Sequence, residues 1–442
     1  MQRGIDQEAL PRTFQDAIFL VRELGIKYLW VDALCIIQDD VADVHREIGL
    51  MGKIYQGALL NIGGLLDQGT TKETGVGLFT TRDPRQHTPF AVNIRWLGKD
   101  LQLRVYGSAA FEEIAKAPLM GRGWVLQERL LSPRSLYFGE QIHWECTESS
   151  ACESFPEKKA QPFFSFPRFG HSVPLRITTL LEENVPFRGG EHEKSDVYRS
   201  WMQIVEWFSN CKLSFGGDCF PALSGLQRQF EEVLQDEYLV GMWRRDIINE
   251  LGWFVKHDIH ECATAPSWSW ASVVIPVAFP MHWDSNESSY SERTIANVES
   301  IEMKQDDKLN SGNISSGRLR ISGHMVRSSE RLCERKPLVV DSFPSSYEVY
   351  DAGYTADALR SSSGSFHFIL HHYDTTFGTL RRMDEVRVLL GLIVECIDQR
   401  LQLYRRIGMF RHCLGCSDEP CEYHEFDDWD PSRSERHTIT IV

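Results

Sequence analysis

Glu128 is one of two acidic residues of this chain that could take part in catalysis. It follows Trp124 by four positions in the word Trp-Val-Leu-Gln-Glu, and residues at i and i+4 share one face of a helix. The tryptophan would flank a pocket while the carboxylate points into it. A carboxylate held there stabilises positive charge that develops on a reacting carbon. The alternative is structural, with Glu128 paired to Arg122, Arg129 or Arg134.

Asp32 is the second candidate. It follows the apolar segment Tyr28–Val31, which we expect to be a strand of a parallel sheet. Ligands of open α/β sheets bind at the carboxyl ends of the strands, and a charge there is costly unless it is paired or used. The alternative is a cap, or a salt bridge with Arg122 or Arg129. Cys35 lies three residues further on, and we expect it to pack as a small buried hydrophobe rather than to react.

The C-terminal tail carries a cluster of metal-binding residue types. His412-Cys413 and Cys416 are followed by Cys421 and His424. Four such side chains can form a tetrahedral zinc site, for which we select Cys413, Cys416, Cys421 and His424. The alternative is a loop of reduced cysteines that binds no metal. We expect no other cofactor.

Alternating helix and strand signals surround the two acidic candidates. Helical spacing of apolar residues predicts a helix over 11–24, which Gly25 ends as a C-cap, and a second helix over 43–56. Short apolar runs predict strands over 28–34 and 58–62. This order favours a parallel sheet with crossover helices. Asp32 would then lie near the segment 122–128, and one site could use both acids.

Composition changes along the chain predict three parts. The α/β pattern fills residues 1–150. Residues 151–192 are rich in Pro, Phe, Glu and Gly, which predicts a linker. Residues 193–442 begin with helical patterns and continue as short strand-like runs, so we expect a mixed α+β region there.

Charge and hydropathy exclude several classes of function. The 442 residues carry a net charge of −15, which gives no general attraction to nucleic acid or to anionic lipid. No apolar run approaches the roughly 20 residues that span a bilayer, and the first residues do not form a signal peptide. The eleven cysteines are an odd number and are scattered, as in reduced cytosolic proteins. We therefore expect a cytoplasmic protein with neither nucleic-acid nor membrane partners.

Four short sequence motifs within residues 1–150 occur in the order typical of one protein family. Leu10–Ala17 is similar to an opening helix, Tyr28–Asp39 to the most recognisable motif, Met51–Ala58 to the next helix and strand, and Gly121–Arg134 to the closing block. Together they resemble the fungal heterokaryon incompatibility (HET) domain. Words such as Ala265–Ser272 are similar to the later part of longer proteins of this family. One feature departs from the family pattern, because no strand word of the Ala-Leu-Ser-Tyr type precedes Leu10. We expect a HET domain that lacks the family's first strand.

The resemblance implies a fold and a function. The implied fold is Toll/interleukin-receptor-like, a flavodoxin-like parallel sheet. The implied role is non-self recognition and programmed cell death, in signalling with other proteins and possible self-association. Some Toll/interleukin-receptor-like domains cleave NAD with a Glu in a similar helical word, which would make Glu128 the charge stabiliser, Trp124 the pocket wall and Asp32 an orienting group. The alternative is a non-catalytic or degenerate interaction module.

Overall fold

The structure of the protein is a computed structural model. It describes residues 4–66, 77–81, 85, 88, 90–105, 109–146, 149–160, 164–165, 172–173, 191–255, 265–273, 276–279, 291–305, 314–327, 347–350, 365–379, 382–414 and 435–442. Contacts divide the chain into two units. The first consists of Met1–Glu193, Cys211–Ser214 and Pro221–Val233, and the second of Lys194–Asn210, Phe215–Phe220 and Leu234–Val442.

The N-terminal helices of the first unit begin and end close to where the sequence predicts. Helix α1 spans Arg12–Glu23, and α3 spans Val41–Gly57. Gly25 follows α1 with a φ of 70°, which confirms the predicted C-cap glycine. The side chain of Asp40 accepts hydrogen bonds from the N–H groups of Ala42 and Asp43 and so caps α3. Both helices are therefore set by local sequence signals.

One sheet organises the first unit. Its strands are β1 (Asn61–Gly64), β4 (Arg134–Phe138), β5 (Ile142–Cys146), β6 (Ser150–Cys152) and β7 (Phe155–Ala160), in that order. Strands β1 and β4 are parallel, with Asn61 opposite Ser135. The other three pairings are antiparallel. The expected α/β content is confirmed, but the sheet has one parallel pair among the described residues rather than a parallel order throughout.

The strand predicted over 28–34 is wrong. Residues 26–31 belong to no strand, and Asp32–Cys35 form a short helix, α2. The side chain of Asp32 accepts a hydrogen bond from the N–H of Ala33 at 2.7 Å, and the N–H of Ile36 donates to the carbonyl of Asp32 at 3.0 Å. Tyr28 is 89 % exposed. A short apolar run does not by itself distinguish a strand from a helical turn, and here the acidic residue favours the first turn of a helix.

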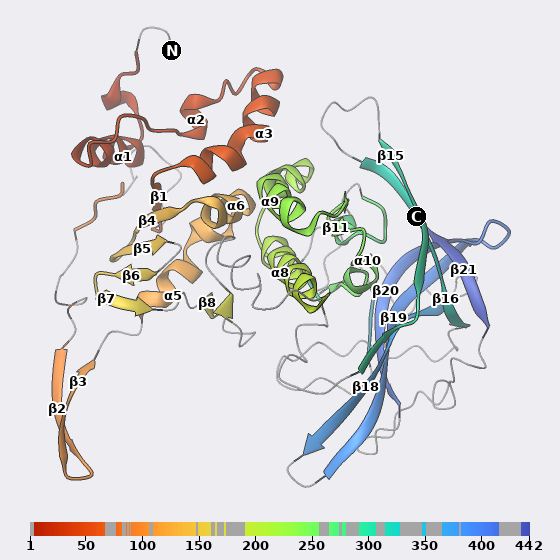
Figure 1. Ribbon diagram of the computed structural model, residues 1–442. Helices are drawn as coiled ribbons and strands as arrows, with labels where there is room; N and C mark the ends of the chain where they lie inside the picture. The colour runs from red at the N-terminus through yellow and green to blue at the C-terminus, as the bar shows by residue number, and fades with distance from the viewer. Residues whose placement is uncertain are drawn as a thin grey trace. The chain divides into compact units, whose positions relative to one another are not determined.

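Further elements complete the first unit. The chain between β1 and β4 forms a hairpin of β2 (Phe90–Trp96) and β3 (Lys99–Val105), then α5 (Ala109–Lys116) and α6 (Gly123–Leu131). Strands β6 and β7 extend the sheet to Ala160, inside the segment predicted as a linker, and β8 (Phe164–Ser165) pairs with β9 (Ser172–Val173). Figure 1 shows these elements in red, orange and yellow.

A close approach between α3 and α9 (Ser224–Leu234) fixes the position of α6. A Cβ atom built on Gly52 would lie 2.7 Å from the Cα of Gly225, so this contact requires glycine. The side-chain oxygen of Gln127, on α6, accepts a hydrogen bond from the N–H of Gly225 at 2.6 Å. Helices α3 and α6 are therefore held by the same glycine backbone, and this contact positions the side chains that α6 presents.

The second unit begins with helices and small strand pairs. Helix α8 covers Glu191–Ser209. The chain turns at Val240 and Gly241, whose φ values of 43° and 97° no helix accommodates, and the short α10 then spans Ile247–Glu250. The small strands are β10 (Tyr238–Leu239), β11 (Met242–Trp243), β12 (Phe254–Val255) and β13 (Val277–Ala278).

A strand-rich core completes the second unit, as the sequence predicts. The long strands are β14 (Ser291–Thr294), β15 (Asn297–Gln305), β16 (Ile314–Arg327), β17 (Tyr347–Tyr350), β18 (Ser365–Thr379), β19 (Arg382–Asp398), β20 (Leu403–Leu414) and β21 (Arg436–Ile441). Strand β16 pairs with both β21 and β18, so strands β18, β19, β20, β21 and β16 close into a ring. Ile369, Leu389 and Phe410 are fully buried in its core. None of the described helices combines the length and apolar character needed to cross a bilayer.

Candidate functional site

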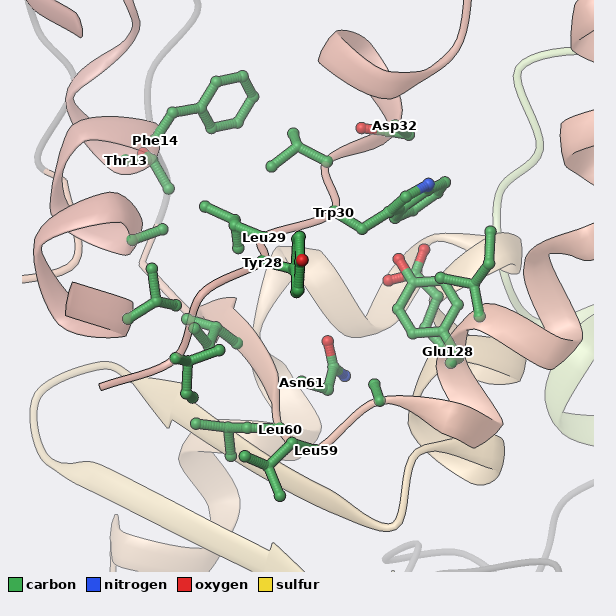
Figure 2. A pocket seen from close by; sticks show the side chains of 18 of the residues that line it. Thr13, Phe14, Tyr28, Leu29, Trp30, Asp32, Leu59, Leu60, Asn61 and Glu128 are labelled. Carbon is green, nitrogen blue, oxygen red and sulfur yellow. The ribbon is translucent and has the colours of Figure 1, made fainter. Parts of the chain in front are cut away.

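A cavity of about 660 Å³ lies in the first unit, within the range of small-molecule sites. Helix α1, the segment 26–32, the end of α3, strand β1 and the start of α6 supply its walls. Figure 2 shows the labelled side chains of Trp30, Asp32, Asn61 and Glu128 around it. Asp32 and Glu128 line the same cavity, although 96 positions separate them in the sequence.

Glu128 is a half-buried carboxyl group in the wall of this cavity. Removal from water raises its pKa to about 7, and the negative charge of Asp32 also raises it. A hydrogen bond from Tyr55 and the positive charge of Arg122 act in the opposite direction. Near neutral pH the group is therefore divided between its acid and its carboxylate, the condition in which a side chain exchanges protons most readily.

Tyr55, at the end of α3, is the hydrogen-bond partner of Glu128. Burial raises the pKa of the Tyr55 hydroxyl, and the charge of Glu128 raises it further. The hydroxyl therefore keeps its proton and donates it in the hydrogen bond. The ring of Trp30 packs edge-on against Tyr55 with the ring centroids 5.7 Å apart. Trp30, Tyr55 and Glu128 thus form a connected row of side chains along one wall.

The charges of the cavity come in both signs. Asp32 and Glu128 are the acidic residues that line it, and Lys27 and Arg122 are the basic ones. Arg122 lies just before the first residue of α6, while Glu128 lies further along that helix. The polar amide of Asn61, on β1, also lines the cavity and donates to the hydroxyl of Ser135 at 3.4 Å. Such a lining suits a ligand that carries both anionic and polar groups.

The structure places the other expected residues outside this cavity. Trp124 is not among the residues that line it, and Trp30 is the tryptophan that does. Arg129 makes a bidentate ion pair with Glu145, at 2.9 and 2.5 Å, so this arginine is engaged on another face of α6. Cys35 is exposed rather than buried, and the prediction that it packs inside was wrong, because α2 leaves its side chain at the surface.

Sequence reasoning missed Trp30 and Tyr55 as site residues, and it named Arg122 only as an alternative ion-pair partner of Glu128 or Asp32. Trp30 and Tyr55 stand in words with a regular apolar pattern, and such words are typical of core residues. No single sequence motif marks these three residues as members of one site. An aromatic residue just before Asp32, a tyrosine at the end of the next helix and an arginine just before α6 converge only when the chain folds.

The zinc prediction falls mainly outside the described residues. Cys413 lies in β20, whereas Cys416, Cys421 and His424 belong to the segment 415–434, which the structure does not describe. Elsewhere, the described residues contain no group of three or more His, Cys, Asp or Glu side chains that could hold a metal ion. Zinc at the tail stays a prediction, and stoichiometric metal in elemental analysis of the purified protein tests it.

Comparison with known families identifies a part of the first unit. The family model described as heterokaryon incompatibility protein (HET) matches residues 1–128. Residues 1–128 are a HET domain. Every residue that lines the cavity falls within the HET domain, whose matched region ends at Glu128 itself. No curated protein and no solved structure is similar enough to the chain to count as a match.

Proposed function

We propose that this protein is an effector of heterokaryon incompatibility whose HET domain hydrolyses NAD. The observation that carries the proposal is a single cavity lined by Asp32, Arg122 and Glu128. Within this cavity, Glu128 is hydrogen-bonded to Tyr55. The proposed wider role is programmed cell death after non-self recognition, exerted in the cytoplasm together with other signalling proteins.

The reaction adds water across the bond between nicotinamide and ribose. The carbon–nitrogen bond breaks, and its electron pair leaves with nicotinamide, which becomes neutral. The ribose carbon then carries oxocarbenium-like positive charge. Water attacks this carbon and loses a proton, so the products are nicotinamide, ADP-ribose and one proton. Only groups that bind the charged transition state more strongly than the substrate accelerate this step.

Each residue has a separate role in the proposed site. Ionised Glu128 stabilises the positive charge, and Tyr55 holds its carboxylate in place. Asp32 orients the ribose hydroxyls. Lys27 and Arg122 offer positive charge to the pyrophosphate. Trp30 takes the role of the aromatic wall that the sequence assigned to Trp124.

A Toll/interleukin-receptor-like fold is part of the same proposal. The parallel pair β1–β4, with α3 leading directly into β1, supports it. The antiparallel strands β5, β6 and β7 depart from a flavodoxin-like order. The proposed site does not depend on them, because none of its lining residues comes from these three strands.

Nicotinamide release from NAD by the purified protein tests the proposal. Glu128→Gln keeps the side-chain size and removes the charge, so turnover should fall by roughly 10²-fold or more, while a thermal melt shows an intact fold. Glu140→Gln, an exposed acid outside the cavity, is the matched control and should keep full activity.

Two outcomes contradict the proposal in different ways. Equal cleavage by the wild type and Glu128→Gln removes Glu128 from the mechanism. Absence of cleavage by a folded wild type, across pH 6 to 9 at millimolar NAD (the upper range of ordinary KM values, about 1 mM), favours the alternative of a non-catalytic interaction module.

A further inference from the structure

The hairpin of β2 and β3 is amphipathic over its whole length. Leu97 and Gly98 form its two-residue turn, with φ values of 48° and 76°, as a type I′ turn requires. The register places Trp96 opposite Lys99 and Ile94 opposite Leu101. Because side chains alternate between the faces of a strand, one face collects most of the apolar positions of both strands: Phe90, Val92, Ile94, Trp96, Leu101 and Leu103.

This apolar face is open to solvent. Phe90 is 60 % exposed, Trp96 64 % and Leu103 45 %. The other face is polar and includes an ion pair between Arg95 and Asp100 at 3.7 Å. Figure 1 shows the hairpin as two long strands with no other strand drawn beside them. A lone two-stranded hairpin is marginally stable in water, and three or more strands give a stable sheet.

The turn also determines which backbone groups of β3 point outward. In a two-residue hairpin the residues that flank the turn, Trp96 and Lys99, form a hydrogen-bonded pair. Hydrogen-bonded and non-hydrogen-bonded pairs then alternate along the register. The outward-facing N–H and C=O groups of β3 therefore belong to Asp100, Gln102 and Arg104. Among the described residues, β3 pairs only with β2.

The sequence of β3 is complementary to itself in antiparallel order. When two copies pair about Gln102, Asp100 stands opposite the partner's Arg104, and Arg104 opposite the partner's Asp100. These residues have outward-facing N–H and C=O groups, so in this register the backbone donors of each copy face the backbone acceptors of the other. On the apolar face, Leu101 stands opposite the partner's Leu103. Opposite charges and apolar pairs directly across a sheet stabilise it, and like charges destabilise it.

We propose that the HET domain self-associates through this edge, two copies joining their β3 strands into one four-stranded antiparallel sheet with two-fold symmetry. The same arrangement is less favourable for β2, because pairing about Asn93 sets Arg95 opposite the partner's Ala91 and gains no charge pair. The interface is separate from the cavity and does not depend on the proposed NAD hydrolysis. It gives the exposed hairpin the additional strands that its stability requires.

A charge reversal on β3 tests the interface in the full-length protein. The register places Arg104 opposite Ala91, so Arg104→Asp leaves the ion pair between Arg95 and Asp100 in place. In the dimer, the new Asp at position 104 of each copy would stand opposite Asp100 of the other copy, which gives two pairs of like charges. Sedimentation equilibrium should show at least about a tenfold weaker dimer. The triple variant Arg95→Asp, Asp100→Arg, Arg104→Asp reverses the charges at these three positions, keeps each pair opposite in sign, and should restore the dimer.

Controls and contrary outcomes are distinct. Lys53→Asp makes the same change in net charge on an exposed part of α3 and should leave the dimer intact. A wild type that is monomeric at about 100 μM overturns the proposal. A dimer that Arg104→Asp leaves unchanged but Trp96→Ser dissociates means that the apolar faces stack, which also overturns edge pairing. A monomer that binds vesicles of anionic lipid assigns the hairpin to a membrane instead.

Discussion

Replacement of Glu128 by glutamine should stabilise the protein at neutral pH. The pKa of Glu128 is raised to about 7 in the folded protein, chiefly because the cavity wall removes it from water. The ordinary pKa of this carboxyl group in the unfolded chain is near 4.3. Below that pH the group is protonated in both the folded and the unfolded state, so it does not lower the free energy of unfolding. The free energy of unfolding then falls as pH rises toward 7, because the folded state resists the loss of the proton.

The magnitude follows from the same pKa values. One pKa unit corresponds to about 1.4 kcal/mol, so the ionised group costs up to roughly 3 kcal/mol at pH 8. Glu128→Gln removes this cost and keeps the hydrogen-bond acceptor for Tyr55. We expect little difference in the free energy of unfolding between variant and wild type at pH 4. The variant should gain roughly 2–3 kcal/mol at pH 8.

Urea unfolding of both proteins between pH 4 and 8 measures this difference. The assay reports the free energy of unfolding, and the difference between the two curves isolates Glu128, since the other titrating groups are shared. Glu140→Gln, exposed and outside the cavity, is the matched control for the loss of one carboxyl group. A difference between Glu128→Gln and wild type that stays constant from pH 4 to 8 would refute the reasoning, because an unshifted carboxyl group gives no such slope.

Two further predictions concern the contacts that hold this site. Gly52→Ala should lower the free energy of unfolding by about 1–3 kcal/mol in urea titrations, because its Cβ would lie 2.7 Å from the backbone of Gly225. Gly49→Ala, in the same helix with nothing within 4 Å, should instead stabilise by about 0.5–1 kcal/mol, and equal effects at both sites would contradict the packing argument. Tyr55→Phe should raise the pKa of Glu128 further, by roughly one unit in NMR titrations, since the hydroxyl favours the carboxylate; an unchanged pKa would show that this hydrogen bond does not form.

Local signals in the sequence predicted the helices that surround the site. Apolar spacing and the C-cap Gly25 give α1, and Asp40 gives the start of α3, because caps and amphipathic spacing act between residues close in the chain. Glu128 and Asp32 were also accessible to sequence reasoning. Each lies in a recognisable sequence motif. The expectation that the two residues lie close together followed from the predicted order of helices and strands alone. The match of residues 1–128 to the HET family agrees with those words.

The tertiary structure alone decided what surrounds the two acids. Tyr28–Cys35 has the composition of a buried strand, yet it forms an extended segment and a helical turn beside a cavity, because no strand pairs with it among the described residues. Burial, which raises the pKa of Glu128, depends on Tyr55 and on the walls that α1, α3 and β1 bring together. A residue's charge and spacing are written in the sequence, but its distance from water depends on contacts between segments that are far apart along the chain.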